Sequence, residues 1–262
     1  MHPRVKSALA IIDHAVAEFS PSHIFGMFSG GHDSLCATHI ASLHPKFSGA
    51  VHINTTIGIE ETREFVRETA KVLGWPLTEY VPPVSYRDII LRDGFPGPGA
   101  HRYMYIRLKE RCMDRLIREH KTKHNDRILL VTGVRLQESK RRMGHVEAIK
   151  REKCRVWTAP ILDWSADDKL EHIAEYNLPQ NTVVKTMCMS GECLCGAFAE
   201  PDELEQIKTF YPKTAAVIEG LQFEAARAGV HAKWGKRPPR KADARQIDMA
   251  MCWSCEAKKE AA

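Results

Sequence analysis

The chain contains no apolar run long enough to span a bilayer, so a transmembrane helix is not expected. Its N-terminus leads into an amphipathic segment over 8–19 that charged side chains interrupt, which is not the pattern of a secretory signal peptide. We therefore expect a cytoplasmic protein with no membrane partner. Composition is ordinary for a globular protein, and 262 residues suffice for one large α/β domain with an appendage.

The sequence also lacks the Gly-Lys-Ser/Thr ending of a Walker A loop. It carries instead the run Ser29-Gly30-Gly31-His32-Asp33-Ser34. An apolar run over 24–28 precedes this run, and helical apolar spacing follows it. A strand, a glycine turn and a helix N-terminus in this order bring backbone N–H groups and the helix dipole to one point, which favours an anion.

The side chains of this run suit a phosphate. Gly30 and Gly31 let the main chain approach a phosphate without a Cβ clash. Ser29 and Ser34 offer hydroxyl groups to phosphate oxygens. Asp33 is placed either to cap the helix or to help hold Mg²⁺. We interpret the run as a nucleotide site.

Strand and helix patterns alternate through the first two thirds of the chain. Apolar runs predict strands over 24–28, 50–54, 77–81, 128–133 and 155–162. Helical spacing predicts helices over 60–73 and 102–123, and a capping box of Ser165 and Asp168 begins another that runs to about Tyr176. The glycine- and proline-rich segment 85–101 is expected to be largely loop. This alternation predicts an α/β fold with a doubly wound, mostly parallel sheet and ligands at the carboxyl ends of its strands.

One arginine follows a predicted strand closely. Gly133 ends the strand over 128–133, and Arg135 comes two residues later. The carboxyl ends of parallel strands meet at one edge, so Arg135 is expected beside the glycine run, where it can pair with phosphate or sulfate.

Charge alone does not identify a partner. The net charge is +5, and basic residues gather over 107–123, 140–142, 150–155 and 233–241. Each run by itself is typical of a solvated surface. Together they leave a nucleic-acid substrate and a nucleotide alone equally open.

The eight cysteines are unevenly distributed. Five of them crowd the last third of the chain: Cys188, Cys193, Cys195, Cys252 and Cys255. In a cytosolic protein such grouping favours a metal over disulfides, with a redox dithiol as the alternative. The two close pairs, at 193 and 195 and at 252 and 255, can together hold Zn²⁺ or a 4Fe–4S cluster. We therefore predict a nucleotide-binding domain over 1–180 and a small, helical, cysteine-rich extension over 181–262, in which two helices within 201–227 bring the pairs together.

Several motifs carry a family resemblance. Ser29-Gly30-Gly31-x-Asp33-Ser34 resembles the PP-loop of the N-type ATP pyrophosphatases. With the segments 54–65, 133–142 and 157–179, in this order, it resembles the phosphoadenosine phosphosulfate (PAPS) reductase family, within the adenine nucleotide α-hydrolase-like superfamily. The resemblance covers roughly residues 25–179.

The resemblance implies a Rossmann-like sheet with an adenine nucleotide lying across the strand ends. It places the run from Ser29 to Ser34 at the phosphates, Thr55 and Thr56 near the nucleotide, and Gly133 and Arg135 at the anionic end of the substrate. Asp33, Ser34 and Arg135 are then the catalytic candidates. His32 stands where lysine is frequent in this family, so we expect binding to depend on pH near 6 to 7.

The chain departs from true PAPS reductases at the cysteines. Those enzymes carry a nucleophilic cysteine in a C-terminal Glu-Cys-Gly-Leu/Ile-His motif, which has no match here. The paired arrangement resembles cluster-bearing relatives, which favours the 4Fe–4S cluster over Zn²⁺. All five clustered cysteines, at 188, 193, 195, 252 and 255, are candidate ligands.

The leading hypothesis is an ATP pyrophosphatase that binds ATP and Mg²⁺ and activates a substrate for sulfur transfer, with a sulfur-donor protein as a further partner. The alternative is a reductase of PAPS or adenosine phosphosulfate that releases sulfite and uses Cys188 as its nucleophile. A third hypothesis is a non-catalytic nucleotide- or nucleic-acid-binding module with a structural metal. The oligomeric state stays open.

Overall fold

A six-stranded sheet forms the centre of the molecule. The computed structural model describes residues 2–138 and 147–238. The strands lie in the order β3 (Leu77–Tyr80), β2 (Phe47–Ile53), β1 (His23–Met27), β4 (Ile128–Val131), β6 (Arg155–Thr158) and β5 (Ile149–Glu152). The first five are parallel, and β5 pairs with β6 in the antiparallel sense at one edge. The predicted fold class is confirmed.

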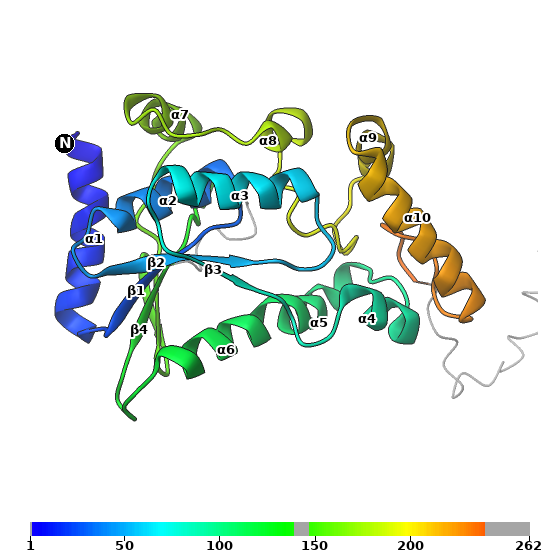
Figure 1. The fold of residues 1–262 in the computed structure, drawn as a ribbon, viewed down its shortest axis with the longest axis horizontal. Coiled ribbons are helices and arrows are strands. Elements are labelled where there is room, and N and C mark those ends of the chain that lie inside the picture. The colour runs from blue at the N-terminus through cyan, green and yellow to red at the C-terminus, as the bar shows by residue number, and fades with distance from the viewer. Residues whose placement is uncertain (1, 139–146, 239–262) are drawn as a thin grey trace, which may run out of the picture.

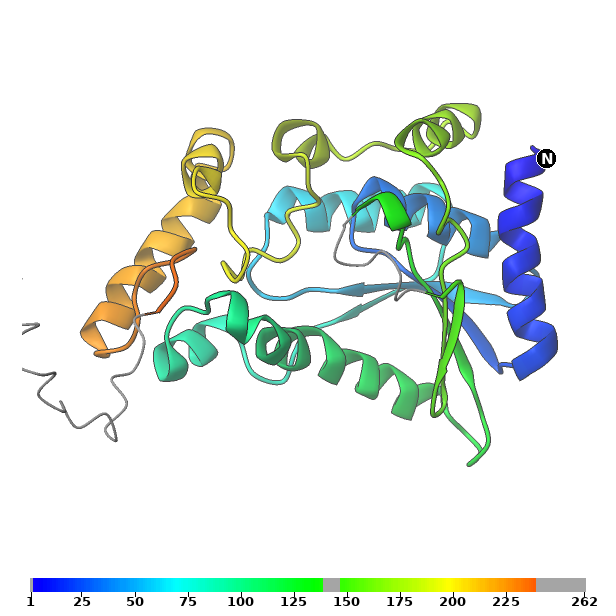
Figure 2. The same cartoon turned by 180° about the vertical axis from the view of Figure 1, so that it is seen from behind.

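Helices cover both faces of this sheet (Figure 1). On one face lie α2 (His32–Ser42), α3 (Glu60–Val72), α7 (Ala166–Glu175) and α8 (Thr182–Met187). On the other lie α4 (Tyr86–Asp93), the short turn η1 (Pro98–Ala100), α5 (His101–Tyr105), the π-helical turn η2 (Ile106–Glu110) and α6 (Arg111–His120). Helix α1 (Pro3–Phe19) lies at one end, and α9 (Glu203–Phe210) and α10 (Pro212–Arg227) lie at the other, as the reverse view also shows (Figure 2).

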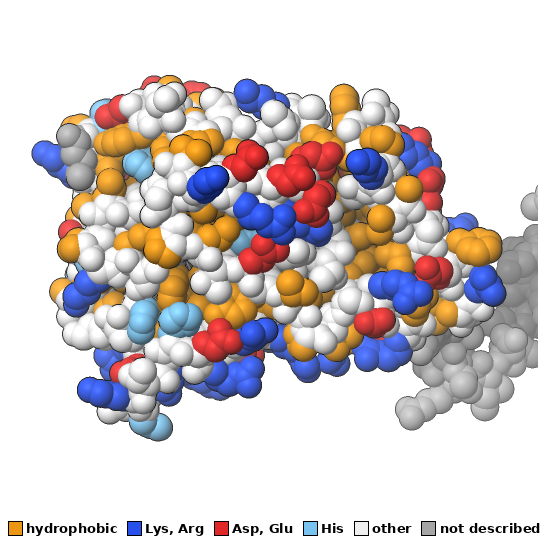
Figure 3. All heavy atoms as spheres, viewed as in Figure 1, with side chains coloured by type: hydrophobic (Ala, Val, Ile, Leu, Met, Phe, Trp, Pro, Cys, Tyr) orange, Lys and Arg blue, Asp and Glu red, His pale blue; other side chains and the backbone are white. Residues whose placement is uncertain are grey.

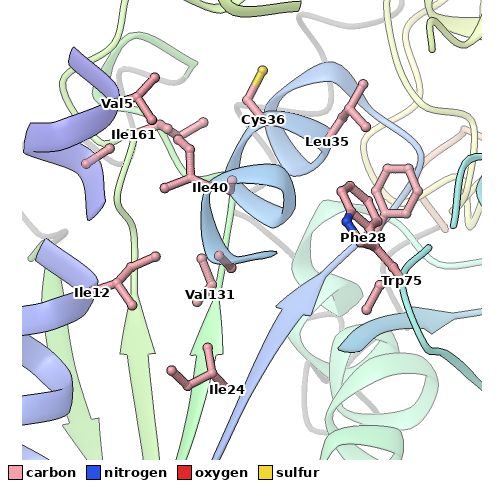
Figure 4. Close-up of a cluster of buried hydrophobic side chains, with 14 of the residues drawn as sticks. Val5, Ile12, Ile24, Phe28, Leu35, Cys36, Ile40, Trp75, Val131 and Ile161 are labelled. Atoms are coloured by element: carbon pink, nitrogen blue, oxygen red, sulfur yellow. The ribbon is translucent and has the colours of Figure 1, made fainter. Parts of the chain in front are cut away.

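The largest apolar cluster fills the space between α1, α2 and the sheet (Figure 4). Ile12 of α1, Leu35 and Ile40 of α2, Ile24 of β1 and Val131 of β4 are all fully buried there. Burying one such side chain contributes about 1.5–3 kcal/mol relative to leaving it exposed. Because β1 and α2 both belong to this cluster, the turn between them, residues 28–31, is held at both ends.

The strand order places two turns next to each other. From β1 the chain moves outward through β2 to β3, and then returns to the other side of β1 through β4. Strands β1 and β4 are parallel neighbours, with Gly26 opposite Val131. The turn after β1 and the short turn η3 (Leu136–Glu138) after β4 therefore follow adjacent strands at the same edge, where doubly wound sheets bind ligands.

Three local predictions were wrong. Residues 86–93 form α4 rather than loop, because the Ser85 hydroxyl accepts a hydrogen bond from the Asp88 N–H and begins a helix. Strand β5 was not expected, because its side chains are mostly exposed and give no apolar run. Asp33 does not cap α2, whose N-cap is Gly31 without a side-chain hydrogen bond.

The C-terminal helices share a core with earlier parts of the chain. One apolar cluster contains Ile57 and Ile90, from the first half of the chain, together with Leu194, Ile218 and Trp234. The two helices predicted within 201–227 are confirmed as α9 and α10. Within 2–138 and 147–238, no helix has the length and apolar character that crossing a membrane requires.

Candidate functional site

A cavity of about 710 Å³ lies at the carboxyl ends of the central strands. Its wall combines residues of the turn after β1 with residues that follow β4, and with side chains of α6, α7 and the cysteine-rich segment. Most of the predicted phosphate-binding residues line it: Ser29, Gly31, His32, Asp33, Ser34, Gly133 and Arg135. A cavity of this volume is in the range that holds a nucleotide-sized ligand.

The turn after β1 is ordered by its two serines. The Ser34 hydroxyl donates to the Gly31 carbonyl at 2.9 Å and accepts from the Ser29 N–H at 3.2 Å. The two hydroxyl oxygens are 3.1 Å apart. These contacts fix both hydroxyls at the cavity wall, so a phosphate would meet groups that are already oriented.

Two glycines are required by close packing around this turn. Gly30 has φ +80°, and a Cβ there would lie 2.7 Å from the Thr62 side chain. The amide of Asn181 donates to the Gly30 carbonyl at 3.0 Å. A Cβ at Gly133 would run into the backbone of Asp33. The turn is therefore supported from behind by α3 and α8, and its fit against β4 depends on Gly133.

Asp33 gathers two cations at the cavity. Its Oδ1 accepts from Arg135 Nε at 2.6 Å and lies 3.0 Å from Lys169 Nζ. Arg135 is buried, and its other guanidinium nitrogen donates to the Trp164 carbonyl at 3.1 Å. Both ion pairs use Oδ1, and within residues 2–138 and 147–238 no hydrogen bond or ion pair engages Oδ2.

Lys169 is a site residue that the sequence analysis missed. It belongs to α7, whose capping box is confirmed: Ser165 Oγ accepts from the Asp168 N–H and Asp168 Oδ2 accepts from the Ser165 N–H. The first turn of α7 thereby faces Asp33. The signal that would have found Lys169 is its position one residue after this capping box, on a helix that follows the last parallel strand.

His32 lines the cavity with a nitrogen that has no partner. Its Nε2 is buried and makes no hydrogen bond within the described chain. Burial lowers the pKa of His32, and the nearby Lys169 cation lowers it further. The imidazole is therefore mostly neutral at pH 7.

Thr55 and Thr56 do not line the cavity. Thr55 is buried, and its hydroxyl donates to the Glu192 carbonyl oxygen at 2.6 Å while its N–H donates to Glu192 Oε1 at 2.9 Å. Thr56 accepts from the Tyr86 N–H at 2.9 Å. Glu192 is buried, lines the cavity and places Oε2 3.2 Å from His52 Nε2. The two threonines thus connect the loop after β2 to the cysteine-rich segment and to α4.

The clustered cysteines separate into two places. Cys188, in a left-handed conformation with φ +55°, is exposed in the wall of the nucleotide cavity. Cys193 and Cys195 line a second, smaller pocket of about 220 Å³. Cys252 and Cys255 lie outside the described residues. The structure thus divides the three described members of the predicted metal set.

Cys193 and Cys195 are close enough to share a proton. The neighbouring Cys195 thiol lowers the pKa of Cys193 by hydrogen bonding to its thiolate, and the same interaction together with burial raises the pKa of Cys195. Within residues 2–138 and 147–238, no three His, Cys, Asp or Glu side chains converge as a metal site would require. A metal held by this pair together with Cys252 and Cys255 stays a prediction.

The fold, the glycine turn and the paired cations define a nucleotide-binding protein of the doubly wound α/β class. Residues 23–193 match the model of the phosphoadenosine phosphosulfate reductase domain, and the chain belongs to this family. The predicted resemblance is confirmed, and the family supports an enzyme that acts on nucleotides.

Several solved structures are similar to this chain at low sequence identity. A PAPS reductase from Candida auris in a phosphate complex is 18% identical with TM-score 0.51, over 68% of this chain and 84% of that chain. Yeast FAD synthetase with FAD is 12% identical with TM-score 0.49, over 90% and 86%. Candida glabrata FMN adenylyltransferase with FAD and pyrophosphate is 13% identical with TM-score 0.48, over 70% and 60%. No curated protein matches the chain significantly.

Proposed function

We propose that this protein is an ATP pyrophosphatase that adenylates a substrate for sulfur transfer. The observation that carries the proposal is the arrangement of Arg135 and Lys169, which Asp33 holds side by side next to the serine hydroxyls of the turn. Two cations and a set of backbone N–H groups suit a pyrophosphate leaving group, on which negative charge develops during the reaction.

The residues of the cavity take part in the first step, the transfer of the adenylyl group to the substrate. An oxygen of the substrate attacks the α-phosphorus of ATP, the bond between that phosphorus and the bridging oxygen breaks, and pyrophosphate leaves with the electron pair. Arg135, Lys169 and the N–H groups of the turn stabilise the charge that develops. Mg²⁺, bound with help from Asp33 Oδ2, supplies further charge neutralisation when present. A sulfur nucleophile afterwards displaces AMP from the activated substrate.

In this proposal the cysteines of the second pocket bind a metal, whereas Cys188 does not. Cys193 and Cys195 share one pocket, so we propose that they hold a 4Fe–4S cluster together with Cys252 and Cys255. Zn²⁺ is the alternative metal for the same thiolates. Cys188 faces the nucleotide instead and is left out of this set.

A second function is favoured by the position of Cys188. A free thiol in the nucleotide cavity is what a sulfonucleotide reductase needs for attack on the sulfur of PAPS or adenosine phosphosulfate. Calorimetric titration of anaerobically purified protein with ATP–Mg²⁺ and, separately, with PAPS distinguishes the two functions. We expect selective binding of ATP. Selective binding of PAPS, with sulfite release that stops in Cys188→Ser, would establish the reductase instead.

Replacing Asp33 tests the proposed pyrophosphatase directly. Asp33→Asn keeps the size of the side chain and removes the charge that holds Arg135 and Lys169. We expect release of pyrophosphate, with candidate acceptors that include an oligonucleotide, to fall on the order of 100-fold. Asp167→Asn is the control, because Asp167 is exposed on the same side of the molecule and does not line the cavity. Unchanged turnover in Asp33→Asn would contradict the proposal.

A further inference from the structure

The second pocket lies directly beside the nucleotide cavity. The two share a wall made by Tyr105, Lys109 and Met189. Tyr105 is the residue before the π-helical turn η2 and Lys109 lies within it, in a helix that is otherwise α-helical from 101 to 120. Such wider turns occur often at functional sites, because the inserted residue changes which side chains face one direction. Tyr105 and Lys109, four positions apart on one face of this helix, both line the two pockets.

Lys109 is the cation of the cavity that lacks a carboxylate partner in the described chain. The other two, Arg135 and Lys169, are both held by Asp33. Nearby carboxylates are also engaged, because Glu110 and Asp114 pair with Arg155. Glu192 accepts from Thr55 and faces His52. A half-buried ammonium without a partner at the boundary of two pockets is placed to receive an anion.

The remaining wall of the second pocket is rich in sulfur. Four sulfur-bearing side chains line it: Met104, Met189, Cys193 and Cys195. Leu108 and Ala197 add buried apolar surface, and Glu203 is the one carboxylate in the described wall. A fully hydrated dianion such as sulfate would lose water against this wall without replacement. A ligand with a polarizable sulfur end and an oxyanion end matches both parts.

We propose that the second pocket binds a small sulfur oxyanion that carries a terminal sulfur atom, with the oxyanion at Lys109 and the sulfur end toward Cys193 and Cys195 or the metal that they hold. The ligand would then lie between the cysteine pair and the nucleotide. The sulfur class of this ligand rests on the proposed sulfur-transfer function, whereas the oxyanion site itself rests on the pocket.

Calorimetric titration with sodium thiosulfate, in the presence of saturating ATP–Mg²⁺, tests this proposal on the anaerobic full-length protein. We expect thiosulfate to bind together with ATP, and sulfate to bind about tenfold more weakly or not at all. Lys109→Met should weaken thiosulfate binding about tenfold or more, and Lys109→Arg should restore most of it. Lys6→Met, which removes the same charge from an exposed position on α1, is the matched control and should leave binding unchanged.

Removing a negative charge from the second pocket is a second test, which distinguishes binding in this pocket from a general effect of the protein's charge. Glu203 lines the second pocket and not the nucleotide cavity. Glu203→Gln should therefore strengthen thiosulfate binding by about fivefold and leave ATP binding as it is. Competition between thiosulfate and ATP, equal binding of sulfate, or an unaffected Lys109→Met would overturn the proposal. Failure of ATP itself to bind would instead count against the proposed function.

Discussion

The electrostatics of the nucleotide cavity are set by a few charged side chains. Arg135, Lys169 and Lys109 are cations, and Asp33 and Glu192 are carboxylates, which leaves an excess of one positive charge when His32 is neutral. Both carboxylates are engaged by other side chains. An incoming phosphate therefore meets fixed cations and little free negative charge, which favours an anionic ligand.

If the proposed function holds, we expect His32 to make the binding of ATP depend on pH. Burial and Lys169 lower the pKa of His32 in the free protein, and a bound phosphate raises it again. The imidazolium stabilises the bound anion, so the affinity for ATP should be constant above about pH 7 and rise as the pH falls below 6.5. His32→Lys should bind ATP about fivefold more tightly at pH 7.5. Titration at several pH values checks this.

ATP itself takes up a proton in the same range, so the His32 contribution is the difference between two proteins. His32→Gln removes the titrating group and serves as the reference. If wild-type protein and His32→Gln show the same dependence of affinity on pH, then His32 does not contact the phosphates.

Sequence predicted the part of the site that is contiguous along the chain. The local sequence determines the conformation of the run from Ser29 to Ser34, because strand, glycine turn and helix follow one another. Lys169 reaches the cavity only because β6 and α7 bring it back to Asp33, over a separation of more than a hundred residues. Lys109 depends on a π-helical turn that no sequence pattern used here detects. Long-range placement of this kind follows from packing rather than from local residue type.

At the scale of elements, α2 and α7 connect the phosphate-binding turn to a buried histidine pair. His39 of α2 and His172 of α7 are buried, with His39 Nδ1 3.0 Å from His172 Nε2. The pair is enclosed by the rings of Trp164 and Tyr176. Burial lowers the pKa of each histidine to about 4, so both are neutral when the protein is folded near pH 7.

This pair should make stability depend on pH. Between about pH 6.5 and pH 4 the unfolded chain binds up to about two more protons than the folded chain, so the free energy of unfolding falls as the pH falls through this window. Above pH 6.5 the contribution is fully present. Urea denaturation at pH 7.5, 6.5, 5.5 and 4.5 checks the expected loss.

The matched variants keep a hydrogen bond between the two positions. The double variant His39→Gln and His172→Gln should flatten the dependence of stability on pH in this window. His124→Gln, at an exposed position, should retain the wild-type slope. A double variant with the wild-type slope would show that other groups cause the acid sensitivity.

Sequence periodicity found the elements that bury one face or both. The parallel strands β1 to β4 and β6 were all predicted, and the apolar run of β4, which is buried throughout, reflects cover by helices on both sides. Strand β5 was not predicted. Only the inner face of an edge strand needs apolar residues, and the sequence of β5, Ile-Lys-Arg-Glu, has no apolar run. Helix α4 was hidden by the glycines and prolines that follow it.

At the scale of the whole molecule, many basic side chains lie along one edge. Lys and Arg side chains line the edge of the molecule along which α4 to α6 run (Figure 3). Arg102, Arg111 and Arg118 are exposed there without a carboxylate partner in the described chain. A nucleic-acid partner stays a prediction, and this edge is where its phosphates would be expected to bind.

The predicted division at residue 180 also belongs to this scale. Ile57, Ile90, Leu194, Ile218 and Trp234 belong to one apolar cluster, so residues on both sides of position 180 are buried together. A shared core makes the two parts unfold cooperatively. The domain boundary at residue 180 stays a prediction. We expect the two parts to unfold in a single transition.

Trp234 fixes the last described part of the chain over the cysteine-rich segment. Its indole N–H donates to the Leu194 carbonyl at 2.8 Å, and a Cβ at Gly196 would lie 2.9 Å from its ring. Trp234→Ala should lower the free energy of unfolding by about 3–5 kcal/mol, because a buried aromatic side chain is lost. Trp234→Phe keeps most of the packing and loses the hydrogen bond, so about 1 kcal/mol is expected. Phe223→Ala, at an exposed position, should change stability by less than about 0.5 kcal/mol.

Trp234→Ala should also change the chemical reactivity of Cys193 and Cys195. Trp234 packs on the residues between and beside Cys193 and Cys195, so its removal should speed the reaction of these thiols with iodoacetamide in native protein, as peptide mass mapping would show. Cys188 is already exposed, and its rate should stay the same. Equal acceleration at all three cysteines would mean that Trp234→Ala loosens the whole fold. Acceleration confined to Cys193 and Cys195 would mean that Trp234 itself shields this pair of cysteines.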